Sequence, residues 1–278
     1  MQLKILGSGG GEGFPALFCG CEHCNAARKA GGKSLRSLSQ SLIDGKLLID
    51  LPAASHSHCL KYGLNFGEIE HLLITHTHAD HYVPNILETR GDDFAHNLKS
   101  EKLHIYGNAD VARMFDGVFN VFPISQNIRN GIVFHTVNPC KELQIGGYTV
   151  TVLKAKHAYE QTAFNYIIED GKSSLLYLID SGYPTQETLR FLAKKNKPFS
   201  CVVMDGTMGI TGQYECHMNY AENIALNKKL QELGLVGEKT RVVVSHITHN
   251  YVGVHEEVEE YFRGSGIEPA YDGMELEF

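Results

Sequence analysis

Short apolar runs alternate with amphipathic stretches along the whole chain. Apolar runs that end in a polar residue or a glycine turn predict buried strands at 2–6, 40–44, 46–50, 70–75, 103–106, 132–136, 148–153, 164–169, 174–179, 200–205 and 240–245. Apolar positions spaced three and four residues apart predict helices at 54–62, 81–89, 109–117, 185–195, 219–233 and 255–263. The chain is therefore expected to be an α/β protein.

Glycine-containing dipeptides separate several of the neighbouring strands. Such pairs are typical of tight hairpin turns, and they occur at Asp44-Gly45, Gly146-Gly147 and Asp170-Gly171. Hairpins among interspersed helices favour mixed sheets over a purely parallel sheet. The chain also looks like two similar halves, roughly 1–150 and 151–278. We therefore expect one domain over 1–278, built as a four-layer αββα sandwich.

Composition narrows the class of protein further. Hydrophobic residues make up 43% and charged residues 21% of the chain, which allows a sizeable core and argues against disorder. The formal net charge of −7 argues against broad electrostatic binding to nucleic acid or to an anionic membrane. No apolar run approaches the roughly 20 residues that span a bilayer, and residues 1–7 are too short for a signal segment. These features predict a soluble, cytoplasmic protein.

One stretch gathers four metal-ligating side chains within six residues, His76-Thr-His78-Ala-Asp80-His81. It follows the apolar run of a predicted strand, so His76 and His78 point the same way, because strand side chains alternate. Asp80 and His81 then lie on a turn from which they can reach a second ion. Imidazole suits zinc, iron or manganese, and a carboxylate suits hydrolytic metals. Burying these groups without compensation would be costly, so the stretch predicts a metal site.

Three further polar residues each follow an apolar strand. They are His157, Asp180 and His246, and strand ends of this kind gather at one rim of a sheet. Taken singly, each can be a rim residue hydrogen-bonded to a loop, but the shared pattern favours a second group of ligands. The predicted ligands are His76, His78 and His157 for one ion, Asp80, His81 and His246 for the other, and Asp180 as a bridge.

Two other features of the sequence are interpreted in relation to this metal site. Asp50 also ends a strand, and we interpret it as the acceptor for a ring N–H of a metal-bound histidine, with a turn-forming role as the alternative. The glycine-rich segment 7–13 lacks the structural context of a dinucleotide-binding loop. It is interpreted as a loop that lets the backbone approach the metal cleft.

The cysteines suggest a separate metal site. Three of the seven lie together as Cys19-Gly-Cys21-Glu-His-Cys24, a spacing that indicates metal binding rather than disulfides in a chain without a leader. A closed tetrahedral zinc site needs one more donor. His249 can complete it, although spacing alone does not decide which histidine pairs with the cysteines. Cys201 opens an apolar run and is expected to be buried.

These residues resemble a known family. The His-x-His-x-Asp-His stretch, with His157, Asp180 and His246, resembles the metallo-β-lactamase superfamily, whose members place a dinuclear metal cleft between the sheets of an αββα sandwich. The cysteine cluster and His246-Ile-Thr-His249 are similar to the PhnP-like phosphoribosyl cyclic phosphodiesterases of phosphonate metabolism. The resemblance runs from Leu3 to the C-terminus and includes Asp180-Ser-Gly, Val203-Met-Asp205, the segment 217–227 and Asp272-Gly-Met-Glu275.

The resemblance implies a function and a set of roles. It implies two catalytic divalent ions, zinc or manganese, and hydrolysis of a small cyclic phosphodiester, such as 5-phosphoribosyl 1,2-cyclic phosphate, by a metal-bridging hydroxide. Asp80 and His217 are the implied catalytic residues, with His217 near the scissile phosphate. A structural zinc is implied at Cys19, Cys21, Cys24 and His249, and a homodimer is a family expectation.

Three other functions compete with this interpretation. An RNA-processing nuclease similar to tRNase Z would need a basic arm to hold tRNA. No Lys/Arg-rich insertion is visible in the sequence, and the acidic net charge also counts against this function. A thioester or lactam hydrolase is less expected, because a bridging Asp180 favours phosphoester chemistry. A metal-binding protein without hydrolase activity, like the PQQ-biosynthesis relative, is the third, and the full ligand set counts against it.

Overall fold

The computed structural model describes residues 1–250 and 253–278. Its strands are β1 (Gln2–Gly7), β2 (Gln40–Ile43), β3 (Leu47–Ile49), β4 (His71–Leu73), β5 (Leu103–Gly107), β6 (Ile132–Thr136), β7 (Glu142–Ile145), β8 (Tyr148–Lys154), β9 (Phe164–Glu169), β10 (Ser174–Leu178), β11 (Cys201–Asp205), β12 (Arg241–Ser245), β13 (Glu268–Pro269) and β14 (Met274–Glu277). Its α-helices are α1 (Glu22–Ala30), α2 (Ser55–Tyr62), α3 (Ala109–Val121), α4 (Gln126–Asn130), α5 (Gln186–Ala193), α6 (Tyr220–Glu232) and α7 (His255–Phe262).

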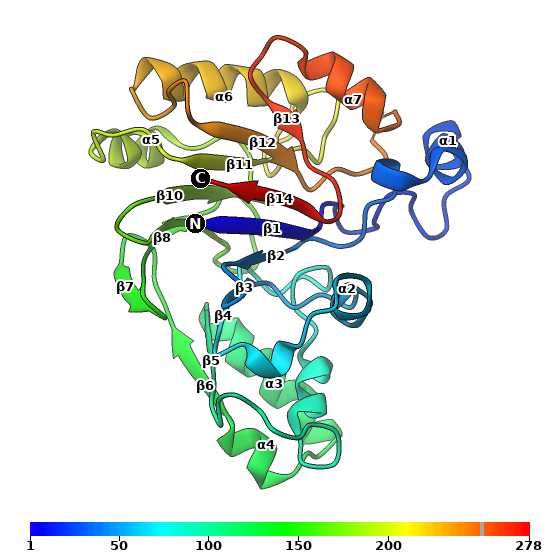
Figure 1. The fold of residues 1–278 in the computed structure, drawn as a ribbon, viewed down its shortest axis with the longest axis vertical. Helices are drawn as coiled ribbons and strands as arrows, with labels where there is room; N and C mark the ends of the chain where they lie inside the picture. The colour runs from blue at the N-terminus through cyan, green and yellow to red at the C-terminus, as the bar shows by residue number, and fades with distance from the viewer. Residues whose placement is uncertain (251–252) are drawn as a thin grey trace.

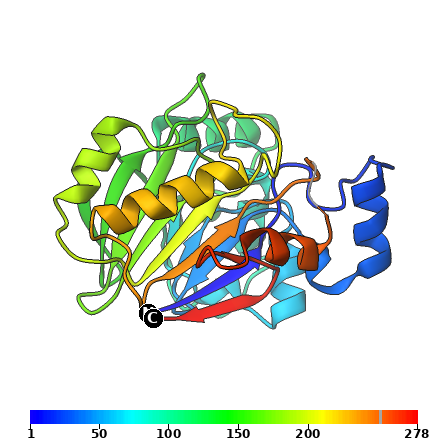
Figure 2. The same cartoon turned by 90° about the horizontal axis from the view of Figure 1, so that it is seen from above.

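Within the described residues, the strands form two sheets of seven. The order is β14-β1-β2-β3-β4-β5-β6 in one sheet and β13-β12-β11-β10-β9-β8-β7 in the other. The last strand, β14, pairs antiparallel with β1, with Gln2 opposite Glu277. The two chain ends therefore lie together in the first sheet, as both views of the ribbon show (Figures 1 and 2).

The three glycine dipeptides lie at hairpin turns, as predicted. β2 and β3, β7 and β8, and β9 and β10 pair antiparallel on either side of them, although β7 was not among the predicted strands. At the first turn, Asp44 and Gly45 both have positive φ, 48° and 67°. A tight hairpin turn of this kind needs such angles, and a side chain other than glycine, asparagine or aspartate adopts them rarely.

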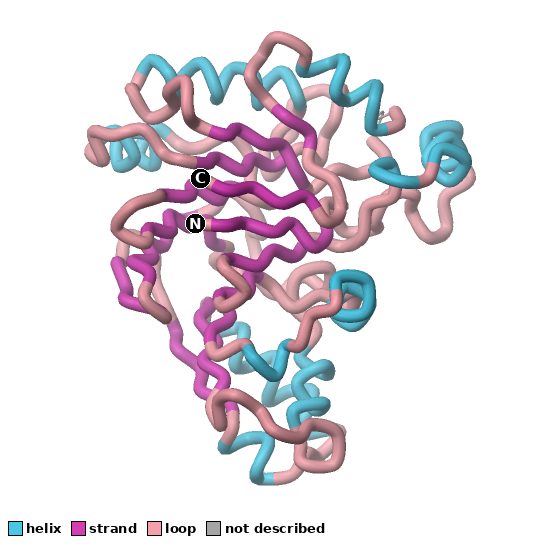
Figure 3. Tube along the Cα trace, in the orientation of Figure 1, coloured by secondary structure: helices cyan, strands magenta, loops and turns pink. Residues whose placement is uncertain are grey.

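The helices cover the outer faces of the two sheets, which pack face to face (Figures 1 and 3). The inner faces share one core, to which Ile49 and Tyr166 belong. The outer face of the first sheet packs on α3 through Phe115, and that of the second packs on α6 through Leu226 and Leu230. Cys201 is fully buried, as expected. The predicted four-layer αββα sandwich is confirmed.

Strand direction brings the candidate site together. β3, β4 and β5 run parallel in one sheet, and β10, β11 and β12 run parallel in the other. β8 points the same way as β10, because both are antiparallel to β9. The carboxyl ends of these strands therefore lie at corresponding rims of the two sheets, where ligands of α/β proteins commonly bind.

Several elements differ from the expected pattern. The helix expected at 81–89 is instead a 3₁₀ helix, Pro84–Arg90, and the strand expected at 70–75 ends at Leu73, because residues 74–83 form the loop that carries the histidine stretch. The elements without a sequence prediction are α1, α4, β7, β13 and β14. They are short or partly exposed, so they carry little hydrophobic pattern. Among the described residues, no helix is long and apolar enough to cross a membrane.

Candidate metal centre

The structure brings all seven predicted ligands of the dinuclear site to one rim. Their donor atoms fall into two groups, each with its atoms within 4.8 Å of one another. One group is His76, His78, His157 and Asp180, and the other is Asp80, His81, Asp180 and His246. Asp180 belongs to both groups, which is the arrangement expected of a bridging carboxylate.

Asp180 lies at the centre of the cluster. Its Oδ2 is 3.2 Å from the Nε2 atoms of both His76 and His157, and 3.3 Å from Nε2 of His81. Asp80 lies on the other side, with its Oδ2 3.2 Å from His81 Nε2 and 3.5 Å from His246 Nε2. The two imidazole groups thus face each other across one buried carboxylate.

The donor set fits divalent cations. Nε2 of His76 and Oδ1 of Asp180 are buried and form no well-directed hydrogen bond in the described part of the chain, although a carboxylate oxygen or an imidazole nitrogen lies within 3.2 Å of each atom. Buried polar atoms are nearly always paired, because an unpaired one loses its hydration without compensation. Nitrogen and carboxylate donors that converge in this way suit zinc or manganese.

Asp50 orients two of the histidines. Its Oδ2 accepts a hydrogen bond from His81 Nδ1 over 2.7 Å, in agreement with the expected role. The hydroxyl of Thr75 donates to Asp50 over 3.0 Å and so accepts from His76 Nδ1, 3.1 Å away. Both rings are thereby oriented with Nε2 directed at the cluster, and an imidazole binds a cation through a ring nitrogen that has lost its proton.

A second carboxylate, Asp205, acts on His246 in the same way. The Thr207 hydroxyl donates to Asp205 Oδ1 over 2.6 Å, so its oxygen accepts from His246 Nδ1 over 2.8 Å. This role of Asp205 was not predicted from the sequence. The signal was present, because Asp205 ends the apolar strand β11, as Asp180 and His246 follow β10 and β12.

His217 lies at the edge of the cluster. Its Nδ1 is 3.0 Å from Asp180 Oδ1 and 3.8 Å from Asp205 Oδ1, and its ring stacks on Tyr214 with centroids 5.8 Å apart. Burial favours the neutral ring, but the two carboxylates outweigh it and raise the pKa of His217 to about 11. This side chain can therefore hold a proton beside the cluster.

Burial and charge set the ionisation of the other groups. Burial lowers the pKa of His157 to about 4 and also lowers that of His76, so both rings are neutral donors. Burial opposes ionisation of Asp80, but the charge of His81 outweighs it and holds the pKa of Asp80 below its usual range. The pKa of Asp180 is likewise low, because His246 and His217 outweigh its burial. Both carboxylates are therefore ionised.

Backbone strain is concentrated at this rim. Asp50, Asp180 and His246 have φ values of 67°, 54° and 59°, and Ala158, beside His157, has 51°. Non-glycine residues adopt this left-handed region at a cost, and such residues cluster at functional sites. At these positions the chain turns sharply out of each strand.

The glycine-rich loop approaches the cluster closely. A Cβ on Gly10 would lie 2.5 Å from Thr248 Cγ2 and 3.2 Å from the ring of His246, and one on Gly11 would lie 3.5 Å from Asp80. Only glycine fits at position 10 without displacing these neighbours. This agrees with the interpretation of 7–13 as a loop that lets the backbone reach the cleft.

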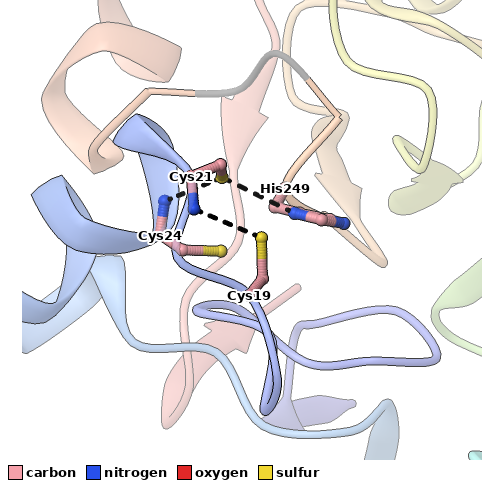
Figure 4. Close-up of side chains that lie close together, drawn as sticks. All are labelled: Cys19, Cys21, Cys24 and His249. Carbon is pink, nitrogen blue, oxygen red and sulfur yellow. Dashed lines mark hydrogen bonds between the residues drawn. The ribbon is translucent and has the colours of Figure 1, made fainter.

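The cysteine cluster forms a second candidate metal site (Figure 4). The donor atoms of Cys19, Cys21, Cys24 and His249 lie within 4.8 Å of one another, and Cys21 Sγ is 3.8 Å from His249 Nδ1. The backbone N–H of Cys24 and then the His249 ring lower the pKa of the Cys21 thiol to about 6, whereas burial raises that of Cys24 to about 11. Three sulfurs and one imidazole are a donor set of closed, tetrahedral zinc sites.

Comparisons with known proteins agree with this geometry. Residues 51–247, most of the chain, match the model of the beta-lactamase superfamily domain. The chain is 25% identical over 179 residues to ribonuclease Z of Clostridium novyi (strain NT), a match that covers 61% of this chain and 51% of that protein. It therefore spans about half the length of this curated relative.

Several solved structures share the fold over 100% of this chain, among them two with a TM-score of 0.73. A diphosphatase from the PhnP family is 22% identical, with a TM-score of 0.73 over 97% of its own chain. Zinc-bound PqqB from Methylobacterium extorquens is 18% identical, with a TM-score of 0.73 over 100% of its chain. The match to the family model, carried by the strands and the rim that hold the histidine cluster, shows that the chain belongs to the metallo-β-lactamase superfamily.

Proposed function

We propose that this protein is a dinuclear metal-dependent phosphodiesterase that hydrolyses a small cyclic phosphodiester, such as 5-phosphoribosyl 1,2-cyclic phosphate. The observation that carries the proposal is the position of Asp180, whose Oδ2 lies within 3.3 Å of histidines from both donor groups. A carboxylate shared between two sets of imidazoles suits a pair of cations, and two-metal sites are common among enzymes that cleave phosphoesters.

Each donor group would hold one cation. His76, His78 and His157 would bind the first, Asp80, His81 and His246 the second, and Asp180 both. Divalent ions bound there supply Lewis acidity and lower the pKa of water toward neutrality. Asp50 and Thr207 keep the rings of His81 and His246 oriented toward the ions.

His217 would serve the leaving group. The departing sugar oxygen needs a proton or a hydrogen-bond donor as its bond to phosphorus breaks. His217 lies outside the two donor groups, and its Nδ1 is 3.0 Å from Asp180 Oδ1, where it can carry a proton. The His217 ring would hold this proton at Nδ1 beside the rim and would transfer it to the leaving oxygen.

The cysteine cluster would bind a structural zinc. Four protein donors fill a tetrahedral site, so no position is left for substrate. The site would join the loop before α1 to the segment after β12, two parts of the chain 228 residues apart at the Cys21–His249 contact. Its role would be to hold the N-terminal loop in place beside the catalytic rim.

The first test is ³¹P NMR of the manganese-loaded protein with 5-phosphoribosyl 1,2-cyclic phosphate. Loss of the cyclic-phosphate resonance and appearance of ribose bisphosphate is the expected result. Cleavage of bis(4-nitrophenyl) phosphate alone would keep the chemistry and reject the substrate. If neither compound is cleaved, a metal-binding protein without hydrolase activity becomes the better interpretation. RNA cleavage in a parallel assay would instead favour a nuclease similar to ribonuclease Z.

A further inference from the structure

An apolar cavity lies on the outer face of the first sheet. It has a volume of about 540 Å³, and small-molecule sites usually measure about 300–1,000 Å³. Its floor is formed by Leu48, Leu72 and Leu103, which belong to β3, β4 and β5 and to the core on that face. Among the described residues, no candidate metal ligand lines it. The cavity is therefore a feature separate from both candidate metal sites.

The segment 91–102 covers this floor. Its Phe94 and Leu98 line the cavity, and the N–H of Lys99 donates to Gly67 O over 3.0 Å, which ties the covering segment to the rest of the fold. Phe94 is nevertheless 63% exposed. An aromatic ring that is both exposed and part of an apolar cavity is stabilised when an apolar ligand removes its surface from water. The cavity thus has an apolar floor, an apolar cover and an opening beside Phe94.

Arg90 brings one positive charge to these apolar walls. Among the described lining residues it is the one arginine, and none is a lysine or a carboxylate. Its Nη2 donates to Ser100 O over 3.0 Å, and it forms no ion pair in the part of the chain that the structure describes. Asp92 and Glu101 line a smaller neighbouring cavity, to which Arg90 also belongs, without pairing with it.

This guanidinium lacks a counterion at a half-buried position. Burial lowers the pKa of Arg90, and no neighbouring charge offsets that effect. A charge that leaves water without a partner is costly, and a guanidinium has five N–H donors, of which one is used here, toward Ser100. The remaining donors can bind an anion that enters the cavity. An anion there would also restore the charge balance that the protein itself does not supply.

We infer that this cavity binds an amphipathic carboxylate, an unbranched alkyl chain that ends in one carboxylate group. The chain would lie on the leucine floor beneath Phe94, and the carboxylate would pair with Arg90. Guanidinium and carboxylate match in shape and form two parallel hydrogen bonds. The leucine floor and the apolar cover offer no hydrogen bonds to a sugar or a nucleotide, so a polar ligand body would be desolvated without compensation.

The first experiment is titration calorimetry of the full-length protein with octanoate, decanoate and octan-1-ol. Decanoate should bind about 15-fold more tightly than octanoate, because each buried methylene contributes about fourfold in affinity. Octanoate should bind about tenfold more tightly than octan-1-ol, because the alcohol has no charge to pair with Arg90. These measurements need no substrate, so they are independent of the proposed phosphodiesterase activity.

The second experiment repeats the titrations with three variants. Arg90→Met keeps an apolar stem but removes the charge, and it should bind octanoate about tenfold more weakly while its affinity for octan-1-ol is unchanged. Lys99→Met is the matched control, since it removes a cation of the covering segment that does not line the cavity, and it should behave like the wild type. Leu98→Trp places a larger side chain in the cavity and should abolish binding of all three compounds.

Three results would overturn the inference. The first is the absence of binding of any of the three compounds to the wild type. The second is equal affinity of the wild type for octanoate and octan-1-ol, which would remove the role of the carboxylate and does not depend on how well Arg90→Met folds. The third is wild-type affinity in a folded Leu98→Trp variant, which would show that the ligand binds elsewhere on the protein.

Discussion

Substitution of Thr207 tests whether its hydroxyl orients the ring of His246 toward the candidate metal site. Thr207→Val keeps the shape of the side chain but removes the acceptor for His246 Nδ1–H and the donor to Asp205 Oδ1, at 2.8 and 2.6 Å. Thr207→Ser retains both hydrogen bonds. Asp205 keeps its bond from the Met218 backbone N–H, at 2.8 Å, so the valine variant should still fold.

The expected effect is a weaker affinity for one cation. Loss of a partner that orients a metal ligand typically costs about 10- to 100-fold in affinity, which corresponds to about 1.4–2.7 kcal/mol. His246 is 2% exposed, so water cannot easily replace the lost acceptor. Only the group that contains His246 should be affected, because the rings of His76 and His81 are oriented through Asp50.

The assay is metal content and competition with a chelator for the wild type and both variants. Thr207→Val should release one ion at a chelator concentration about 10- to 100-fold lower than the wild type, while Thr207→Ser behaves like the wild type. The zinc proposed at the cysteine cluster would serve as an internal control. Equal affinity in Thr207→Val and the wild type would refute the reasoning, as would a serine variant as weak as the valine variant.

Three further predictions follow from single side chains. His78→Ala should abolish turnover, because it removes a cation ligand, while circular dichroism and the melting temperature stay close to those of the wild type; full activity would reject the ligand assignment. Cys21→Ala should lower both the melting temperature and the zinc content, and no change in either would reject the structural zinc. Burial lowers the pKa of His58 to about 4, so the folded state binds fewer protons than the unfolded state between that pH and about 6.5. His58 therefore stabilises the fold above pH 6.5, and this contribution, about 3 kcal/mol, is lost as the pH falls toward 4. Urea unfolding of the wild type and His58→Gln should show a weaker pH dependence in the variant, and identical slopes would contradict this.

Much of the fold was predictable because its central strands are buried on both sides. Such strands appear in the sequence as continuous apolar runs, and β8 to β12 all lie within the predicted ranges or one residue from them. The peripheral elements were harder to predict. In α1 only Cys24 and Ala27 are buried, and β14 alternates buried and exposed residues over four positions, so neither shows a strong hydrophobic pattern.

The candidate site was likewise predictable only in part. The ligand types were evident from the histidine stretch and from polar residues at strand ends, because a strand that leaves the sheet presents its next side chains at the rim. Asp205 shows the limit of that rule. It ends a strand as Asp180 does, but its contact with Thr207 depends on a turn whose path the local sequence does not reveal.

By itself, the sequence determined which chemistry the chain can carry. It placed imidazoles, carboxylates and thiols where strands and loops end, because side-chain type and local periodicity are properties of neighbouring residues. Only the tertiary structure decided which of them meet. Asp180 lies between His76 and His157, which follow β4 and β8, and Cys21 lies beside His249. Arg90 and leucines of β3, β4 and β5 line one cavity. These contacts depend on which strands are neighbours and on how the two sheets face each other, which is set by burial of the shared core rather than by spacing along the chain.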